Sequence, residues 1–369
     1  MWITVHLEWR KWAMNLKFDF YEDEHTPALS FDDVLIVPQY SPILSRKEVS
    51  ISVKFKDFKW GSPIFSTNMD TITGFEMAHR MNQYGAGSII HRYMKLEELR
   101  SEVNRWMHAY SSKESPLILS VGTYARDASR MDTILELSRE FTNLGICVDL
   151  AHGDSRHMLG TIENIRNDGF EGLLIGGAVC TAEGAERLFK AGADVVRVGV
   201  GPGSACTTRI KTGCGYPQLE AISRCSELGP VMADGGIRSP GDACKALAAG
   251  ADAVLLGGLL SGSDCVPGYY DNPNKREVPF RGMASLEARE ANGDADPKNR
   301  EGIATMVPKK GVLSTKNIVI DVQEGIRSAL SYVGAQNISE FHHKASFVRV
   351  SQSTRNENYP HILKTLGAV

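Results

Sequence analysis

Eight short apolar runs recur along the chain, separated by stretches of helical length. Short apolar runs between turn signals are typical of buried strands, and strands that alternate with helices form a parallel sheet. Eight strands favour closure into a barrel, because an open, doubly wound sheet usually has fewer. The sequence therefore predicts an α/β fold, a (β/α)8 TIM barrel, with strands near residues 63–67, 87–91, 117–121, 146–150, 172–175, 195–200, 230–233 and 253–256.

Polar residues and glycines stand directly after these runs. In a barrel of parallel strands, the residues that follow each strand lie at the same end, where barrel enzymes keep their active sites. Two histidines are among them, and a hydrogen-bonded structural histidine is more common than a catalytic one. The residues are Asn68-Met69-Asp70, His91-Arg92, Gly122, Asp149, His152-Gly153, Gly176-Gly177, Gly201 to Cys206, Asp234-Gly235-Gly236 and Gly257-Gly258.

The sixth run leads into the most unusual stretch of the chain, which reads Gly-Pro-Gly-Ser-Ala-Cys-Thr-Thr-Arg over residues 201–209. Its glycines allow a tight bend in which backbone N–H groups and the Ser204 hydroxyl face an anionic ligand. The same N–H dipoles favour a thiolate at Cys206, so the loop is expected to carry a nucleophile. The alternative is a small buried cysteine in a glycine turn, which is the commoner role of a single cysteine.

Two glycine pairs indicate a phosphate site late in the barrel. Gly235-Gly236 follows the seventh run and Gly257-Gly258 follows the eighth, and both pairs can present backbone N–H groups to a phosphate. The alternative is that the glycines only allow close packing of a strand against a helix. Because Asp234 would repel a phosphate, its carboxylate is expected to accept hydrogen bonds from ribose hydroxyls.

Composition excludes several classes of function. The 369 residues are 42% hydrophobic, enough for one barrel of about 250 residues with additions. A net charge of −3, with dispersed charges, leaves no basic footprint for nucleic acid or a membrane surface. Seven scattered cysteines without a CxxC pair argue against a zinc site or a disulfide framework. No apolar run approaches the roughly 18 residues of a membrane span, so we expect a cytoplasmic protein.

The pattern also suggests a domain organisation. Residues 1–29 are predicted to form an N-terminal extension, and residues 30–369 a single barrel domain. The regular alternation is lost over about 261–311, and a stretch of that length in a compact barrel indicates a mobile functional lid rather than a further element. A helical pattern resumes at Asp321.

The loop and several other motifs resemble the IMP dehydrogenase and GMP reductase family. Besides residues 201–209, the similar segments are Thr-Gly-Cys-Gly-Tyr-Pro-Gln at 212–218, Ser-Phe-Asp-Asp-Val-Leu at 30–35, Asn-Met-Asp-Thr at 68–71, Phe-Arg-Gly-Met at 280–283, Glu-Gly at 301–302 and Tyr-Val-Gly-Ala at 332–335. The resemblance covers residues 30–352 and implies the same barrel fold. Dehydrogenases of the family commonly carry inserted CBS modules, for which residues 94–117 leave no room.

The resemblance implies a cysteine that attacks C2 of a purine nucleotide, and it leaves two branches open. In the reductase branch, GMP loses ammonia and accepts hydride from NADPH to give IMP; in the dehydrogenase branch, IMP, NAD and water give XMP. The dehydrogenase activates water with an Arg-Tyr pair before the Glu-Gly, and here Arg300 is followed by no tyrosine. Glu301 and Thr208 match the reductase's proton-delivery pair, so the chain looks closer to GMP reductase. A dehydrogenase lacking CBS modules, or a non-catalytic purine-nucleotide-binding barrel, is the alternative.

The roles implied by the resemblance are as follows. Cys206, Thr208 and Glu301 are the expected catalytic residues. The nucleotide is expected to contact Thr67, Met69, Gly203, Ser204, Asp234, Gly235, Gly236, Gly257, Gly258, Gly282 and Met283. The expected NADPH contacts are Arg92, Asp149, Gly201 and Ser285, and the carbonyls of Gly201, Gly203 and Cys206 are candidates for K⁺. A homotetramer is also implied.

Three positions depart from the reductase pattern. Ala178 replaces the asparagine usual in the family, Ala284 stands where reductases tend to have serine, and Ala151-His152-Gly153 looks more like the dehydrogenase. The preference for NADPH is therefore less firmly indicated than the deamination.

Overall fold

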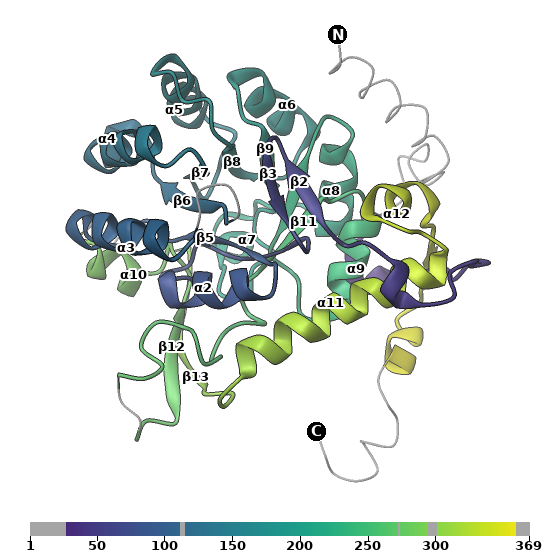
Figure 1. Cartoon of the computed structure of the whole chain (residues 1–369). Coiled ribbons are helices and arrows are strands. Elements are labelled where there is room, and N and C mark those ends of the chain that lie inside the picture. Colours follow the sequence, from purple (N-terminus) through teal and green to yellow (C-terminus); the bar gives the residue numbers. More distant parts are fainter. Residues whose placement is uncertain (1–26, 111–114, 272–273, 294–300, 359–369) are drawn as a thin grey trace.

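The computed structural model describes residues 27–110, 115–271, 274–293 and 301–358, and its centre is a closed barrel of eight parallel strands (Figure 1). Consecutive strands are neighbours, and the last pairs with the first, Val254 opposite Ile64. The predicted TIM barrel and all eight predicted strands are confirmed. The strands are β4 (Ile64–Ser66), β5 (Gly87–Ile90), β6 (Leu117–Val121), β7 (Leu144–Asp149), β8 (Leu174–Val179), β9 (Val195–Val198), β10 (Val231–Asp234) and β11 (Ala253–Leu256).

Strand β8 is the one that differs most from its predicted range. The glycine pair Gly176-Gly177 was expected to follow the strand, but β8 continues through it to Val179. Close packing explains the glycines, because a Cβ on Gly177 would lie 2.6 Å from Cβ of Arg197 on the neighbouring strand. Gly177 therefore makes room for the backbone and Cβ of residue 197.

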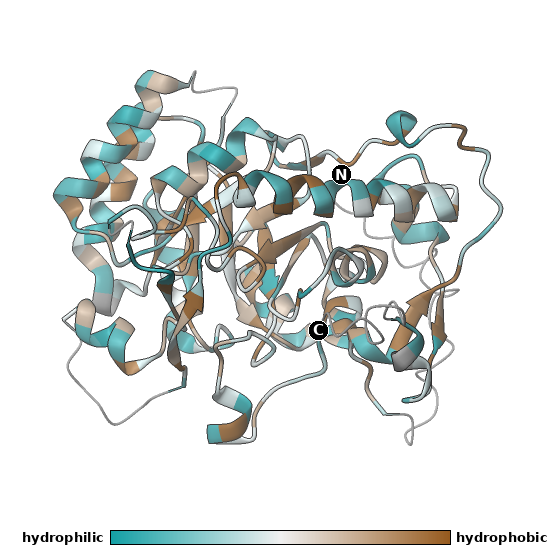
Figure 2. Ribbon diagram, turned by 90° about the horizontal axis from the view of Figure 1, so that it is seen from below, coloured by the Kyte–Doolittle hydropathy of each residue, from teal (hydrophilic) through white to brown (hydrophobic). Residues whose placement is uncertain are grey.

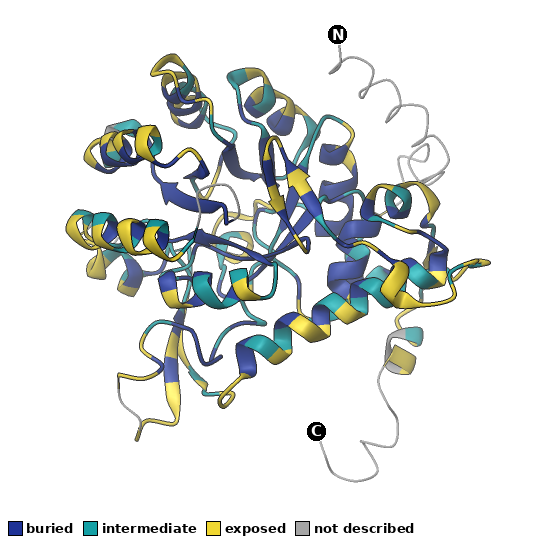
Figure 3. Ribbon diagram, viewed as in Figure 1, coloured by how far each residue is buried: buried dark blue, intermediate teal, exposed yellow. Residues whose placement is uncertain are grey.

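Helices surround the barrel and bury their apolar faces against it, leaving polar residues outside (Figures 2 and 3). At least one helix follows each barrel strand, as the alternation of the sequence predicts; β9 is followed by two, and β12, α10 and β13 stand between β11 and α11. These outer helices are α2 (Phe75–Gln83), α3 (Leu96–Ala109), α4 (Tyr124–Glu140), α5 (Arg156–Asn167), α6 (Ala182–Ala191), α8 (Gln218–Ser226), α9 (Pro240–Ala248) and α11 (Ser314–Val333). Helix α11 starts seven residues before the expected Asp321. No helix within the described ranges has the length and apolar character that a bilayer crossing requires.

A hairpin closes the N-terminal end of the barrel. It consists of β2 (Val53–Phe55) and β3 (Phe58–Trp60), which immediately precede β4. The ring centroids of Trp60 and Phe65 are 4.8 Å apart, and the hairpin shares one apolar cluster with inward-facing residues of all eight strands. The active-site end of the barrel is therefore the opposite one.

The remaining short elements extend the barrel. Strand β1 (Val34–Ile36) pairs antiparallel with β14 (Phe347–Arg349) and so joins the two ends of the described chain. The others are α7 (Thr208–Thr212), α12 (Ile338–Lys344) and the 3-10 helices η1 (Phe31–Asp33), η2 (Arg46–Glu48) and η3 (Thr354–Asn358). Residues 1–26 of the predicted extension lie outside the described residues.

The predicted lid contains regular structure, contrary to the expectation of a segment without elements. Strands β12 (Glu277–Arg281) and β13 (Ala304–Pro308) form an antiparallel pair, and α10 (Leu286–Ala291) lies between them in sequence. Strand β12 alternates buried Val278 and Phe280 with exposed residues, but it is only five residues long and contains Pro279, and β13 is almost wholly exposed, so neither was predicted from the sequence pattern.

Candidate active site

A chain of hydrogen bonds joins the three predicted catalytic residues. Cys206 lies in the loop between β9 and α7, and its Sγ donates to Thr208 Oγ1 at 3.2 Å. Thr208 Oγ1 in turn donates to Glu301 Oε2 at 2.9 Å. All three residues are half-buried. A proton can therefore pass between a sulfur and a carboxylate that are far apart in the sequence.

Backbone contacts hold Glu301 over the cysteine loop. Cys206 and Gly302 form an antiparallel bridge, and Thr207 N donates to Glu301 O at 3.1 Å. Ile303 N donates to Ala205 O at 3.0 Å. The loop and the lid thus behave as two short strands paired edge to edge, which fixes the carboxylate beside the thiol.

An ion pair anchors the β12–β13 hairpin to the barrel. Arg281 Nη2 lies 2.5 Å from Oδ2 of Asp70, which follows strand β4. Asp70 N also lies 3.4 Å from the sulfur of Met283, a predicted nucleotide contact. Gly282 packs against the cysteine loop, since a Cβ there would be 3.0 Å from Ala205 O. The lid residues named by sequence are therefore brought to the mouth of the barrel.

The predicted phosphate loops converge on the cysteine loop. A Cβ on Gly258 would lie 2.8 Å from Ser204 Oγ, and one on Gly235 would lie 3.0 Å from Gly203 N. Larger residues would fill the space in which N–H and hydroxyl groups can approach a ligand. The same close packing brings Gly257 to Thr67 and Met69, and Gly236 to Pro202. Ser204 itself is exposed.

Arg197 is a charged residue of this site that was not predicted from the sequence. It lies on β9 with its side chain only 6% exposed. Its Nη1 is 2.7 Å from Asp149 Oδ1 and its Nη2 is 2.5 Å from Asp234 Oδ2. A single arginine within the apolar run 195–200, two residues after an inward-facing valine, was the signal that could have identified it.

The predicted cofactor side contains a second arginine. Arg92 Nε lies 3.8 Å from Asp149 Oδ2, is buried and has no hydrogen-bond partner within the described part of the chain. The Arg92 guanidinium lies 4.7 Å from the centre of the Tyr93 ring. Burial alone would raise the pKa of Asp149, but the positive charges of Arg197 and Arg92 outweigh it and hold the pKa below its usual value. Asp149 is therefore an anion beside an unused donor.

Three residues predicted to contact the cofactor or K⁺ make contacts within the protein itself. Ser285 is fully buried, and its hydroxyl caps α10 by accepting from Ala288 N at 3.2 Å. Gly201 packs against the side chain of Arg209. The Gly203 carbonyl accepts from Cys206 N at 3.0 Å, which leaves an oxygen lone pair for a cation. The roles of these residues toward cofactor or K⁺ stay predictions.

His91 is a structural histidine. It is buried, and its Nδ1 accepts a hydrogen bond from Tyr93 N at 3.2 Å. Burial lowers the pKa of His91 from 6.5 to about 4, so the ring is neutral at physiological pH.

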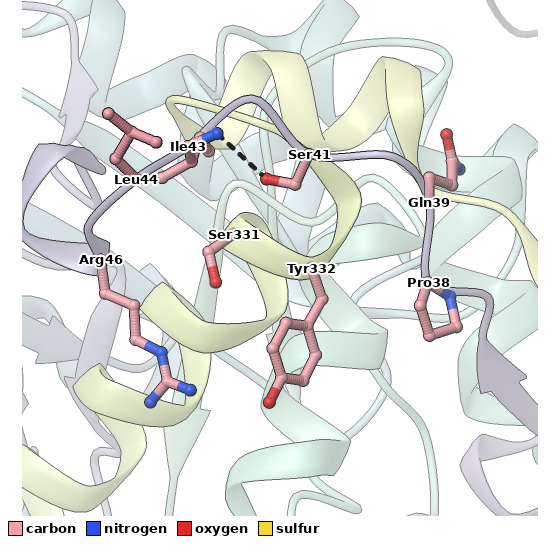
Figure 4. Close-up of a pocket in the computed structure, with 8 residues that line it drawn as sticks. All are labelled: Pro38, Gln39, Ser41, Ile43, Leu44, Arg46, Ser331 and Tyr332. Carbon is pink, nitrogen blue, oxygen red and sulfur yellow. Dashed lines mark hydrogen bonds between the residues drawn. The ribbon is translucent and has the colours of Figure 1, made fainter.

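A surface pocket of about 380 Å³ lies apart from these residues, between residues 38–46 and the end of α11 (Figure 4). Its one charged lining residue is Arg46, whose guanidinium lies 5.8 Å from the centre of the Tyr332 ring. Among the residues that line the pocket in the described part of the chain, none is a cysteine, histidine or carboxylate, and none belongs to the site around Cys206.

Comparisons with known proteins agree with this geometry. The sequence pattern of the IMP dehydrogenase / GMP reductase domain matches residues 28–361. The protein named GMP reductase of Buchnera aphidicola subsp. Schizaphis graminum is 37% identical over 344 residues, which cover 89% of this chain and 96% of that protein. GMP reductase of Yersinia pestis (strain Pestoides F) is 38% identical over 340 residues, covering 88% and 95%. The chain belongs to the IMP dehydrogenase / GMP reductase family.

Proposed function

We propose that the protein is an NADPH-dependent GMP reductase, which converts GMP into IMP and ammonia. The observation that carries the proposal is the hydrogen-bonded chain from Cys206 through Thr208 to Glu301. A carboxylate one hydroxyl away from the nucleophilic sulfur is suited to deliver a proton to a departing amine. The similarity to proteins named GMP reductase supports the same branch.

Proton transfer along this chain accounts for the deamination. Thr208 passes the thiol proton of Cys206 to Glu301 while the sulfur bonds to C2 of GMP. Glu301 then returns a proton through Thr208 to the 2-amino group, and the C2–N bond breaks to release ammonia. The purine remains bound to Cys206 through C2 as a thioimidate. NADPH, when bound, supplies the hydride that reduces C2, after which the C2–S bond breaks and IMP leaves.

The other residues of the site would bind and orient the two reactants. Ser204 and the N–H groups around Gly235, Gly236, Gly257 and Gly258 would hold the phosphate, and Asp234 the ribose. Asp149 and Gly201 would face the nicotinamide ribose or carboxamide of NADPH. Arg92 would contact a cofactor phosphate, because its buried Nε has no hydrogen-bond partner within the described residues. A cytoplasmic homotetramer that binds K⁺ is part of the same proposal.

The dehydrogenase reaction is the main alternative and needs an activated water in place of a proton donor. The lid sequence carries Arg300 without a following tyrosine, and residues 294–300 lie outside the described structure. The carboxylate that the structure does describe is hydrogen-bonded toward the thiol, which favours amine departure over attack by water.

Two parallel assays separate the branches. Purified protein is given GMP with NADPH, or IMP with NAD, and the nicotinamide absorbance and ammonia are followed. We expect NADPH consumption matched by ammonia release, and a Cys206→Ala variant that binds GMP without turnover. NADH formation from IMP, without ammonia release from GMP, would overturn the proposal in favour of the dehydrogenase. A Cys206→Ala variant with full biological effect would point to a non-catalytic nucleotide-binding barrel.

A further inference from the structure

The buried guanidinium of Arg197 connects the carboxylates of Asp149 and Asp234. Asp149 is assigned to the cofactor and Asp234 to the nucleotide ribose. Asp149 follows the inward-facing Cys147 by two residues, and Arg197 and Asp234 stand in the same relation to Val195 and Met232. Alternation along a strand therefore directs all three charged side chains into the barrel, one layer above its apolar core.

The contacts of Arg197 are made by both arms of its guanidinium. Nη1 binds Asp149 and lies 3.5 Å from Cys147 Sγ, whereas Nη2 and Nε both bind Asp234, Nε at 3.2 Å. The carboxylates are 14% and 17% exposed, so water screens this group of charges weakly.

We propose that Arg197 is a positioning residue that holds Asp149 and Asp234 at a fixed spacing and thereby sets the nicotinamide half of the cofactor in register with the nucleotide ribose. The inference rests on the proposed function for the identity of the two reactants. The planar fork of arginine can bind two carboxylates at once, which a lysine ammonium cannot do with the same geometry.

Charge balance leads to a distinct effect of pH. Asp149 faces Arg197 and Cys147 within the barrel and Arg92 from the segment after β5, and Asp234 faces it across Arg197. Without the Arg197 cation, Arg92 alone offsets burial and the negative charge of Asp234, so Asp149 takes up a proton at a higher pH. Activity that needs the Asp149 anion then declines from a higher pH as the solution is acidified.

The test compares Arg197→Lys and Arg197→Met with matched changes at Arg166. Arg166 also pairs with a half-buried aspartate, Asp194, at 2.6 Å, but at the N-terminal end of the barrel. For both Arg197 variants we expect kcat/KM to fall about tenfold or more, with KM raised for GMP and for NADPH together. Arg166→Lys and Arg166→Met are expected to keep the wild-type KM values even where the melting temperature falls.

The pH profile separates positioning from a merely structural role. In Arg197→Met, the acidic limb of kcat/KM should move up by about one pH unit or more, and Arg197→Lys, which keeps the charge, should restore most of it. The inference would be overturned if both variants kept the wild-type KM values and the wild-type pH dependence of kcat/KM on the acidic side, and differed only in a lower melting temperature. If Arg197→Met does not fold, the paired rise of both KM values in Arg197→Lys decides it.

The assays also distinguish a failure of the proposed reductase function from a failure of the Arg197 inference. A wild-type protein that does not consume NADPH with GMP contradicts the reductase. Calorimetric binding of GMP and of NADP⁺ at pH 6 to 9 then tests the spacing directly. Arg197→Met should weaken the binding of both ligands and Arg166→Met neither; weakening of neither ligand would contradict the inference.

Discussion

The carboxylate of Glu301 accepts a hydrogen bond from Thr208, which in turn accepts one from the Cys206 thiol. Glu301→Gln keeps the size of the side chain but removes its ability to accept and return a proton. We expect kcat to fall about 10²-fold or more, while GMP binding measured by calorimetry changes little. Glu186→Gln, at an exposed carboxylate paired with Lys190, is the control and should retain wild-type kcat. A Glu301→Gln variant with normal turnover would remove Glu301 from the mechanism.

His91 makes the stability of the protein depend on pH. Its pKa is lowered by burial to about 4, whereas an unfolded chain protonates it near 6.5. Between these values the unfolded state binds the additional proton, so stability falls as pH drops from 6.5 toward 4. The shift corresponds to about 3 kcal/mol in the free energy of unfolding. Urea unfolding between pH 7.5 and 4 should show a shallower loss in His91→Asn than in the wild type.

The control for that measurement is His152→Asn, at a solvent-exposed histidine, which should keep the wild-type slope of stability against pH. Equal slopes in all three proteins would show that the buried state of His91 contributes nothing to acid sensitivity.

Strands β12 and β13 form one paired unit, and the ion pair between Arg281 and Asp70 is the charged contact that ties it to the end of β4. Arg281→Met leaves Asp70, whose side chain is 7% exposed, without its cation. We expect the hairpin to dock less often, so that kcat/KM falls about tenfold and limited proteolysis cuts within 274–293 faster. Arg100→Met breaks an exposed pair with Glu136 and should change neither quantity. Normal kcat/KM in Arg281→Met would mean that the ion pair does not position the lid.

The β2–β3 hairpin stabilises the whole molecule by closing the bottom of the barrel. Trp60→Ala would leave a cavity against Phe65 and the interior ends of the strands. We expect a loss of about 3–5 kcal/mol in the free energy of unfolding, measured with urea. Turnover by the protein that remains folded should be normal, because Cys206 lies at the other end.

Leu44→Ala is the comparison for Trp60→Ala, since Leu44 is 94% exposed and its loss should leave stability unchanged. If Trp60→Ala is as stable as Leu44→Ala, the hairpin does not close the core as described.

The sequence alone determined the barrel, its eight strands and the residues around Cys206. Parallel strands that are buried on both faces consist of continuous apolar residues. Glycines and polar residues follow these strands at the end of the barrel that carries the active site. Both features depend on residues that are close together in the sequence, so they can be recognised before the fold is known. The boundaries were less accurate: β8 runs through a glycine pair and α11 begins at Ser314, because neighbours in space, not local pattern, decided where they start and stop.

Only the tertiary structure decided which charges meet. Arg197 stands in an apolar run and is 37 residues before Asp234 and 48 after Asp149, so no local pattern shows that one guanidinium binds both. The β12–β13 pair was likewise not predicted, because the alternation in β12 spans only five residues and includes Pro279, and β13 is almost wholly exposed. Closure of the barrel brings the inward-facing positions of separate strands to one layer, and that geometry, rather than sequence spacing, pairs the charges.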